Sequence, residues 1–374
     1  MATLILTAEL EMSDWNPIEL PAPDDAPAEG AALALVAEDG TRFPAQRDGE
    51  TIVALVGGLA PGDVRRLRLV AAEPGAPGVT VQQKEDRTLD IRIGDERFTT
   101  YHFGPQYARP FFYPVLGPGG LPVTRAYPMA DVAGETRDHP HHRSFWTAYG
   151  EVSGTDCWSE APGRHGYIRH QSFTRVAGGR AFGGFTETLL WTARDGKPLM
   201  SEERTLRVYA TEPDRRLLDY QTVWIASHGD VEFGDTKEGG IIAFRVATTM
   251  DGNKGGRIEN EHGGIGEREC WGKRAAWVDY SGPVQGQTLG IAVMDHPGNF
   301  RHPTHWHVRD YGLFASNVFG TASFEGGNDK RGQYVLKSGE RLTFRFRVLI
   351  HRGDAKAGKV AEAYHAYVQP PQAR

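Results

Sequence analysis

Three histidines within four positions mark the most unusual stretch of this sequence, Thr136-Arg137-Asp138-His139-Pro140-His141-His142-Arg143-Ser144-Phe145-Trp146. Each imidazole carries a donor and an acceptor that need partners, so the three rings cannot all be buried as packing residues of the core. Pro140 argues against a helix and favours an extended conformation for His139. The stretch therefore predicts a loop or strand end, where binding and catalytic residues are most often found.

The chemistry expected of this stretch is proton transfer, because histidine titrates near neutral pH. We expect His141 and His142 to be catalytic. The neighbouring side chains predicted to bind substrate are His139, Arg143 and Trp146. A polar surface loop without function is the alternative interpretation.

A second stretch, from Asp295 to Tyr311, contains four further histidines. If residues 305–309 form a strand, His305, His307 and Arg309 share one face, and Trp306 and Val308 lie on the other. We expect His307 to be catalytic, and the acid to be either His307 or an imidazole of the first stretch. The substrate-binding residues predicted here are His296, Trp306, Arg309 and Asp310.

The third candidate is Phe233 to Gly240, which places charges of both signs beside flexible glycines, directly before the apolar run Ile241 to Val246. Glu238 is the predicted general base and Asp235 the alternative base. Asp235 and Lys237 are also predicted to bind substrate. The alternative is a polar turn with a local ion pair, which would contribute little to stability.

A metal site competes with acid–base chemistry. His139, His141 and Glu238 could hold a divalent metal, although the spacing follows no standard metal motif. We therefore expect catalysis without a cofactor. The 8 tryptophans include several beside the charged stretches. Aromatic rings next to polar groups suit a sugar, whose C–H faces stack on indole while its hydroxyls take polar partners.

Composition narrows the class of protein. The 374 residues are 39% hydrophobic and 24% charged, with a net charge of -6. These values indicate a soluble globular protein with no basic face for nucleic acid. No apolar run is long enough to cross a membrane, and the N-terminus does not resemble a secretory signal. Cys157 and Cys270 are too few for a disulfide framework. We therefore expect a cytoplasmic protein, whose oligomeric state the sequence does not indicate.

The elements that must position these residues are mostly strands. Short β-prone segments up to about Val70 predict a small β-sandwich over residues 1–75, and residues 71–78 form a linker rich in Pro and Gly. Alternating strands and frequent glycine turns predict a large antiparallel β-supersandwich from residue 79 to about 351, in a domain that extends to 368. The expected class is all-β, with one C-terminal helix within Lys356 to Val368.

The clearest strand is Arg341 to Val348, in which four apolar side chains alternate with four polar ones. This alternation predicts one face in the core and one in solvent. We expect its arginines, Arg341, Arg345 and Arg347, to lie on the solvated face without a function.

Several motifs resemble those of the bacterial PmoA-like family. They are Tyr113-Pro114-Val115-Leu116, Val123-Thr124-Arg125, Asp138-His139-Pro140-His141-His142-Arg143-Ser144, Gly234-Asp235-Thr236-Lys237-Glu238-Gly239-Gly240, Trp271-Gly272-Lys273-Arg274, Asp295-His296-Pro297 and Trp306-His307-Val308-Arg309-Asp310-Tyr311-Gly312. The resemblance covers about residues 98–351. It implies a galactose-mutarotase-like supersandwich and a place beside bacterial sugar-degradation systems. Such proteins are often labelled methane oxygenase, an activity that a chain without a membrane-spanning segment does not support.

Two classes of function follow. The first is an enzyme that acts on a sugar or an oxidised glycoside by His and carboxylate acid–base chemistry, as an epimerase, lyase or hydrolase. The second is a non-catalytic carbohydrate-binding or assembly protein, which needs the same aromatic and polar side chains but no shifted pKa values. In the first class we expect His141 or His142, Glu238 and His307 to converge on one concave cleft.

Overall fold

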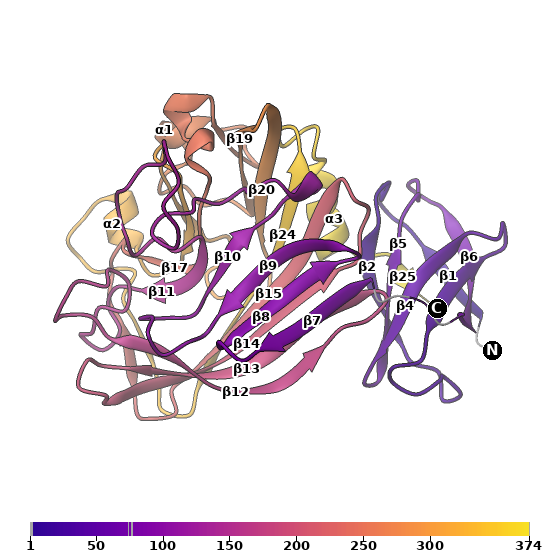
Figure 1. Cartoon of the computed structure of the whole chain (residues 1–374), viewed down its shortest axis with the longest axis horizontal. Helices are drawn as coiled ribbons and strands as arrows, with labels where there is room; N and C mark the ends of the chain where they lie inside the picture. Colours follow the sequence, from indigo (N-terminus) through magenta and orange to yellow (C-terminus); the bar gives the residue numbers. More distant parts are fainter. Residues whose placement is uncertain (1–2, 74, 76–77, 374) are drawn as a thin grey trace.

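A computed structural model describes residues 3–73, 75 and 78–373. Its strands form two stacked eight-stranded sheets, a seven-stranded sheet beside them and a two-stranded sheet (Figure 1). The strand pairs within the named sheets are antiparallel. The fold is the predicted all-β class, a large antiparallel supersandwich with a small β-sandwich at the N-terminal end.

The N-terminal sheet has the order β2-β5-β4-β3-β6-β1-β25. Its strands are β1 (Thr3–Thr7), β2 (Asn16–Pro21), β3 (Leu33–Ala37), β4 (Arg42–Asp48), β5 (Thr51–Val56), β6 (Val64–Ala71) and β25 (Gln372–Ala373). They surround one apolar core, to which Leu6, Leu35, Ile52 and Leu67 contribute. Because β25 pairs with β1, both ends of the described chain meet in this sheet (Figure 1).

The first large sheet has the order β21-β22-β17-β11-β10-β9-β8-β7. Its strands are β7 (Val79–Lys84), β8 (Thr88–Ile93), β9 (Glu96–His102), β10 (Phe111–Val115), β11 (Phe145–Tyr149), β17 (Gly239–Arg245), β21 (His305–Val308) and β22 (Leu313–Asn317). The predicted first and second histidine-rich stretches therefore lead into β11 and β21 of one sheet.

The second large sheet has the order β12-β13-β14-β15-β24-β20-β19-β18. Its strands are β12 (Tyr167–Ala177), β13 (Phe182–Thr192), β14 (Pro198–Tyr209), β15 (Arg215–Ile225), β18 (Arg257–Asn260), β19 (Trp277–Val284), β20 (Gln287–Asp295) and β24 (Arg341–Arg352). The two-stranded sheet pairs β16 (Val231–Phe233) with β23 (Tyr334–Leu336).

Helices are few. The five-residue helices are α1 (Gly266–Cys270) and α2 (Thr321–Glu325), and single 3-10 turns span Pro118–Gly120, Thr248–Met250 and Gly252–Lys254. The predicted C-terminal helix is α3 (Val360–Val368). It buries Val360 and Ala363 against the outer face of the second large sheet and Ala366 in the core of the N-terminal sheet. The helix starts four residues later than the predicted segment.

The core between the two large sheets follows the predicted alternation of β24. Leu342, Phe344, Phe346 and Val348 all belong to it. The polar face of the strand departs from the prediction, because only Arg341 and Arg345 are exposed. Arg347 is 4% exposed and forms an ion pair with Asp219. A solvated face was thus wrong for Arg347, whose charge is compensated by an acid on the neighbouring strand.

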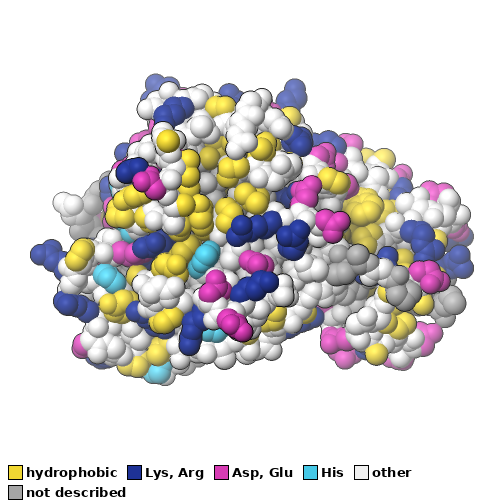
Figure 2. Space-filling view, viewed as in Figure 1, with side chains coloured by type: hydrophobic (Ala, Val, Ile, Leu, Met, Phe, Trp, Pro, Cys, Tyr) yellow, Lys and Arg dark blue, Asp and Glu magenta, His cyan; other side chains and the backbone are white. Residues whose placement is uncertain are grey.

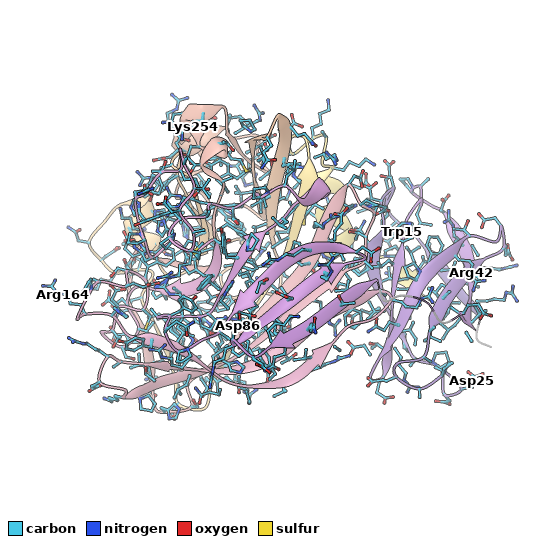
Figure 3. All side chains as sticks on the ribbon, viewed as in Figure 1. Trp15, Asp25, Arg42, Asp86, Arg164 and Lys254 are labelled. Carbon is cyan, nitrogen blue, oxygen red and sulfur yellow. The ribbon has the colours of Figure 1, made fainter. Side chains whose placement is uncertain are left out.

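The N-terminal sheet packs on the second large sheet. Val53 and Leu55 of β5 join Phe182, Leu217 and Leu349 in a shared apolar cluster. Trp15 packs at this junction, as Figure 3 shows by its position between the two parts. Strand β5 is therefore apolar on both faces, since one faces its own sheet's core and the other the supersandwich. The predicted boundary between domains stays a prediction, and part of the predicted linker, residues 74, 76 and 77, lies outside the described residues.

Acidic and basic side chains are interspersed on the face of the molecule seen in Figure 2. Within the described residues, no helix is both long enough and apolar enough to span a bilayer. Cys157 and Cys270 are unpaired and buried, and burial raises the pKa of each thiol to about 12. The two thiols are therefore protonated and unreactive at neutral pH, in agreement with the prediction that they form no disulfide framework.

Candidate active site

One row of paired residues crosses the outer face of the first large sheet. His307 pairs with Ala315, Ala315 with Ala243, and Ala243 with Trp146. Paired residues of antiparallel strands project to the same face, so His307 and Trp146 stand on one surface with two alanines between them. Their backbones are roughly 14 Å apart, because neighbouring strands lie about 4.8 Å apart. The sheet thereby sets the two histidine-rich stretches opposite each other.

The loop before β11 is held by a buried arginine. Arg125 is fully buried, and its guanidinium donates hydrogen bonds to the backbone carbonyls of Thr136, Asp138 and His139 at 3.0, 2.9 and 3.1 Å. It also donates to the Asp138 carboxylate. One side chain thus fixes both the backbone of the loop and its acid.

His139 has a left-handed backbone, with φ of 42°, and not the extended conformation that its position before Pro140 predicts. The prediction was wrong because the Arg125 contacts on the carbonyls around His139 select a tighter turn. Such a conformation costs on the order of 1–3 kcal/mol and persists only where the surroundings impose it. It brings the His139 ring back over the loop.

A second buried arginine fixes the protonation state of His142. Arg245 donates from Nη2 to Asp138 Oδ1 at 2.7 Å and from Nη1 to His142 Nδ1 at 3.1 Å. A guanidinium only donates, so His142 Nδ1 must accept and its proton must reside on Nε2. Burial, together with the charges of His141 and Arg245, lowers the pKa of His142 well below its usual value. His142 is therefore a neutral imidazole whose Nε2 is a donor.

The acid of this network is ionised. Burial would raise the pKa of Asp138, but the charge of Arg245 and the contacts with Arg125 and His139 lower it below its usual value. His139 Nδ1 lies 2.9 Å from Asp138 Oδ2, at an angle that departs from an aligned hydrogen bond. Asp138 thus directs His139 Nδ1 toward itself and leaves Nε2 of that ring for another partner.

Aromatic rings stack through the site with nearly parallel planes. His139 lies 4.7 Å from His142 at 7° and 5.0 Å from Tyr311 at 6°, measured between ring centroids. His142 in turn stacks on Trp146 at 5.3 Å. Tyr311 belongs to the turn between β21 and β22, so this stack joins the first and second stretches. We call His139, His141, His142, His307 and Tyr311 the histidine cluster.

Glycine at position 312 allows the Tyr311 turn to close. Gly312 has φ of 94°, and a Cβ there would lie 2.8 Å from Asp251 Oδ1 and 3.3 Å from Arg245 Nε. Asp251 is buried, and burial raises its pKa to about 6 in spite of the Arg245 charge. Arg245 also lies under the Tyr311 ring, 4.9 Å from its centroid. A larger residue at 312 would separate the turn from the arginine network.

His307 is buried and uses little of its hydrogen-bonding capacity. It is 2% exposed, and neither ring nitrogen makes a well-aligned hydrogen bond among the described residues, although the ring contacts the Lys237 backbone. Its ring meets Trp271 and Phe324 edge-on. Burial lowers the pKa of His307 to about 3, assisted by the charges of Lys237 and Arg309. His307 is therefore neutral at physiological pH and offers one donor and one acceptor.

The third stretch, Phe233 to Gly240, lies beside Tyr311 and His307 of the histidine cluster. Burial is the main reason why the pKa of Tyr311 is raised, and the Glu238 carboxylate adds to this effect. The Lys237 charge acts on His307 as described above. The side chains of Glu238 and Lys237 are 48% and 44% exposed, so they lie at the solvent edge of the cluster. The three stretches thus come together, although they are far apart in the sequence.

The histidine cluster is mostly closed to solvent, and the cleft predicted there stays a prediction. His142 and His307 are 1% and 2% exposed. His139, with a side chain 39% exposed, is the accessible imidazole beside Tyr311. Only the solvent edge of the cluster is therefore open in this conformation.

His141 lies at the edge of the cluster, edge-on to His142 and Trp158. Burial and the Arg109 charge lower its pKa to about 4, which makes it neutral at physiological pH. Arg109 is buried and also donates to the His141 carbonyl at 3.2 Å. His141 is thus placed by the same kind of contact that holds His139.

Several predicted substrate-binding residues have other positions. The prediction that Trp306 binds substrate was wrong, because Trp306 belongs to the core between the sheets, on the face opposite His307. The Asp235 carboxylate accepts backbone N–H groups of Ala322, Ser323 and Gly332, so it anchors a loop. His296 lies in a different cavity, beside Tyr367. These three residues do not join the histidine cluster.

Three further residues that were predicted to bind substrate contact other protein side chains or backbone groups near the histidine cluster. Arg143 forms a bidentate ion pair with Glu160, with N–O distances of 2.9 and 3.1 Å. Arg309 pairs with Glu267 at 2.8 Å and also lies near the Tyr311 ring. Asp310 is exposed and accepts the Glu267 backbone N–H at 3.3 Å. Of the three, Arg309 is the one in contact with the cluster.

The alternative metal ligands are not assembled. Among the residues that the structure describes, no group of three or more His, Cys, Asp or Glu side chains is arranged to hold a metal ion. The set His139, His141 and Glu238 therefore fails as a preformed site. His302 and His305 are likewise engaged, with Asp295 at 2.7 Å and Glu325 at 3.0 Å.

Sequence reasoning missed Arg245, Tyr311 and Asp251 as parts of the cluster. Arg245 ends the apolar run that begins at Ile241, and a charged residue in such a strand is a signal for a buried ion pair. Tyr311 and Arg125 stand inside the motifs of the family resemblance but were given no role. Nothing in the sequence around Asp251 indicates its burial.

Comparison with known proteins gives a family. Residues 88–365 match the family described as "Family of unknown function (DUF6807)". The chain belongs to this family. The matched DUF6807 region includes every residue of the histidine cluster and both buried arginines. It begins after β7, so the N-terminal sheet lies outside it.

No curated protein sequence matches the chain. Among solved structures, the crystal structure of galactose 1-epimerase from Lactobacillus acidophilus NCFM is similar, at 6% identity and a TM-score of 0.31. The match covers 74% of this chain and 100% of that one. The function of this DUF6807 protein must therefore be argued from its own residues.

The burial of His307 predicts how stability depends on pH. Its pKa in the folded state, about 3, is below the ordinary histidine pKa of 6.5 that applies to the unfolded chain. The unfolded state therefore binds a proton first, and stability is lost as pH falls below 6.5. We expect His307→Gln to reduce the loss of unfolding free energy between pH 7.5 and 4.5 by about 2–3 kcal/mol.

Urea unfolding at the two pH values measures this effect. The matched control is His262→Gln, since the His262 side chain is 66% exposed. An equal acid loss in wild type and His307→Gln would mean that His307 takes up its proton in the folded state.

Proposed function

We propose that this DUF6807 protein is a carbohydrate-active enzyme, a member of the PmoA-like family, and that it acts on an oxidised glycoside by acid–base chemistry at the histidine cluster. The observation that carries the proposal is the hydrogen bond from Arg245 to His142 Nδ1, which fixes the donor at Nε2 of a neutral ring. A neutral imidazole of this kind can polarise a carbonyl oxygen, as in triosephosphate isomerase.

The first step is removal of the proton from the carbon beside a keto group. His139 takes this proton on Nε2, because Nδ1 of the same ring faces Asp138. The electron pair of the broken C–H bond moves to the keto oxygen, which becomes an enolate. The His142 Nε2–H group donates a hydrogen bond to that oxygen, and the nearby Arg245 charge stabilises it.

Two outcomes can follow from the enolate. Return of the proton to the opposite face epimerises the carbon, and departure of the neighbouring glycosidic oxygen cleaves the glycoside as a lyase does. Glu238, at the solvent edge beside Tyr311, is placed to exchange the second proton in either case. His307 contributes a hydrogen bond to a sugar hydroxyl through its ring. Hydrolysis remains a third reaction that the same acid and base support.

A second candidate is a non-catalytic saccharide-binding protein. The observation in its favour is that the catalytic candidates His142 and His307 are nearly inaccessible in this conformation. For the enzyme, the Tyr311 turn must move to admit a sugar ring. A binding protein could instead hold a sugar at the exposed edge formed by His139 and Glu238.

Turnover separates the two candidates. Purified wild-type protein is incubated with plant and bacterial glycosides, each with and without prior oxidation at C3, and products are separated by chromatography. We expect conversion of at least one 3-keto glycoside and none of its unoxidised parent. Saturable binding of these glycosides without any product would overturn the enzyme proposal in favour of the binding protein.

A further inference from the structure

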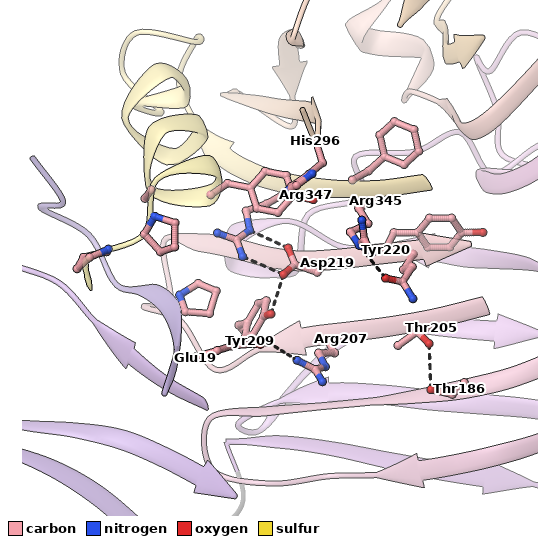
Figure 4. A pocket seen from close by; sticks show the side chains of 17 residues that line it. Glu19, Thr186, Thr205, Arg207, Tyr209, Asp219, Tyr220, His296, Arg345 and Arg347 are labelled. Atoms are coloured by element: carbon pink, nitrogen blue, oxygen red, sulfur yellow. Dashed lines mark hydrogen bonds and ion pairs between the residues drawn. The ribbon is translucent and has the colours of Figure 1, made fainter. Parts of the chain in front are cut away.

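Figure 4 shows a polar cavity of about 560 Å³, whose lining includes no residue of the histidine cluster. Its floor is the outer face of the second large sheet. Its walls come from β2 of the N-terminal sheet and from α3 with the residues that follow it. The volume is in the range of small-molecule sites. The cavity is thus built where three distant parts of the chain meet.

The floor of this cavity is a ladder of paired polar residues. Thr186 pairs with Thr205, Thr205 with Gln221, and Gln221 with Arg345 across four adjacent strands. The hydroxyls of Thr186 and Thr205 are 3.0 Å apart, and Arg345 Nε donates to Gln221 Oε1 at 3.1 Å. A sheet face that presents hydroxyl, amide and guanidinium groups in one row can bind several oxygens of one ligand.

The arginines of the cavity differ in whether a carboxylate compensates their charge. Arg347 is neutralised by two contacts with Asp219, at 2.7 and 2.8 Å, and Arg207 by Glu19 at 2.8 Å and by Asp48. Arg345 has no carboxylate within 4 Å among the described residues. Figure 4 shows it beside Arg347, with its only drawn bond directed to Gln221. Arg207 and Arg347 thus have carboxylate partners, and Arg345 is the arginine of the cavity without one.

His296 adds a donor to the same side. The Gly298 backbone N–H donates to His296 Nδ1 at 3.0 Å, so the proton of the neutral ring must be on Nε2. Burial and the Arg345 charge lower the pKa of His296, which keeps the ring neutral. The ring packs edge-on to Tyr367, whose other neighbour is the Arg347 guanidinium at 4.4 Å. The cavity therefore has a donor-rich end beside an aromatic wall.

We propose that this cavity is a second ligand site, which binds a sugar acid through its carboxylate on Arg345 and its hydroxyls on the polar ladder. A guanidinium fork matches a carboxylate, and the one unmatched charge fits a single anion. The threonine and glutamine side chains pair with hydroxyls, and Tyr209 and Tyr367 give the cavity an aromatic wall that can contact the C–H groups of a sugar. The inference is independent of the function proposed for the histidine cluster.

Calorimetric titration of the full chain tests the site, with D-glucuronate, D-galacturonate and D-gluconate as probes. D-glucose, acetate and inorganic phosphate are the comparison ligands. We expect at least one sugar acid to bind with one site per chain, and to bind more tightly than all three comparison ligands. Absence of binding by every sugar acid, or equal affinity for acetate or phosphate, would overturn the proposal.

Variants locate the bound ligand. Arg345→Gln should weaken binding of the sugar acid by about tenfold or more, since it removes a charge-assisted contact. Thr205→Val should weaken it several-fold from the opposite end of the ladder. The matched control Arg341→Gln lies on the same strand but outside the cavity and should bind as wild type does.

Unfolding midpoints confirm that these variants are folded; Arg345 is exposed, so its replacement leaves the core intact. Unchanged affinity in folded Arg345→Gln and Thr205→Val would place the ligand elsewhere and reject the site. His142→Ala should bind the sugar acid normally, so loss of the proposed catalytic function and loss of this site are distinguishable.

Discussion

Arg125→Met should lower the free energy of unfolding by about 3–5 kcal/mol, the usual cost of breaking one partner out of a buried ion pair. Arg125 is fully buried, whereas the side chain of its partner Asp138 is 33% exposed. Methionine fills a similar volume but leaves the carbonyls of Thr136 and His139 without their donor. The loop that carries the histidines then loses the contact that imposes its turn.

Urea denaturation of the variant beside wild type measures this loss. Arg137→Met is the matched control, because Arg137 also pairs with an aspartate, Asp131, but the two side chains are 60% and 70% exposed. That exposed pair should contribute less than about 1 kcal/mol. Equal effects of the two substitutions would show that Arg125 does not hold the loop.

His142→Ala should reduce kcat/KM for the converted glycoside by about 10²–10⁴-fold, the usual contribution of a positioned proton donor or acceptor. Alanine removes the Nε2–H group and leaves Arg245 Nη1 without its acceptor. His142→Asn should retain more activity than alanine, since the amide oxygen can accept from Arg245 while its NH2 group donates to substrate. The loss should fall mainly on kcat, because the hydrogen bond strengthens as the enolate forms.

The control for this series is His228→Ala, a substitution of an exposed histidine in a turn remote from the cluster. Its kinetics should equal those of wild type. Each variant is compared at the same fraction of folded protein, from its unfolding curve. An alanine variant at position 142 with wild-type kcat/KM would remove His142 from the reaction.

The strands were predictable because their signals are local. Alternation in Arg341 to Val348 identified which side chains enter the core. The faces of Trp306 and His307 also followed from alternation, yet the assignment of Trp306 to the substrate ignored that it lies on the core side. The two-residue period of a strand shows on which face a side chain lies. For Trp306 this face, and not the aromatic residue type, decides whether the side chain can contact substrate.

The contacts of the site were not predictable, because they join residues far apart in the sequence. Arg245 lies 103 positions from His142, and only the strand order β11-β17 brings them together. The conformation of His139 likewise depends on Arg125, which overrides the local effect of Pro140. His296 shares its stretch with His307 but lies in the polar cavity, since the stretch runs from one large sheet to the other.

A structure of His142→Ala with the converted glycoside tests the central claim most directly. This variant should bind the sugar but turn it over slowly, so the complex can be captured in a crystal. We predict that the keto oxygen lies where the His142 ring was, and that the carbon to be deprotonated lies within hydrogen-bond reach of His139 Nε2. A glycoside bound only in the polar cavity, or at any site without contact with His139, would contradict the account.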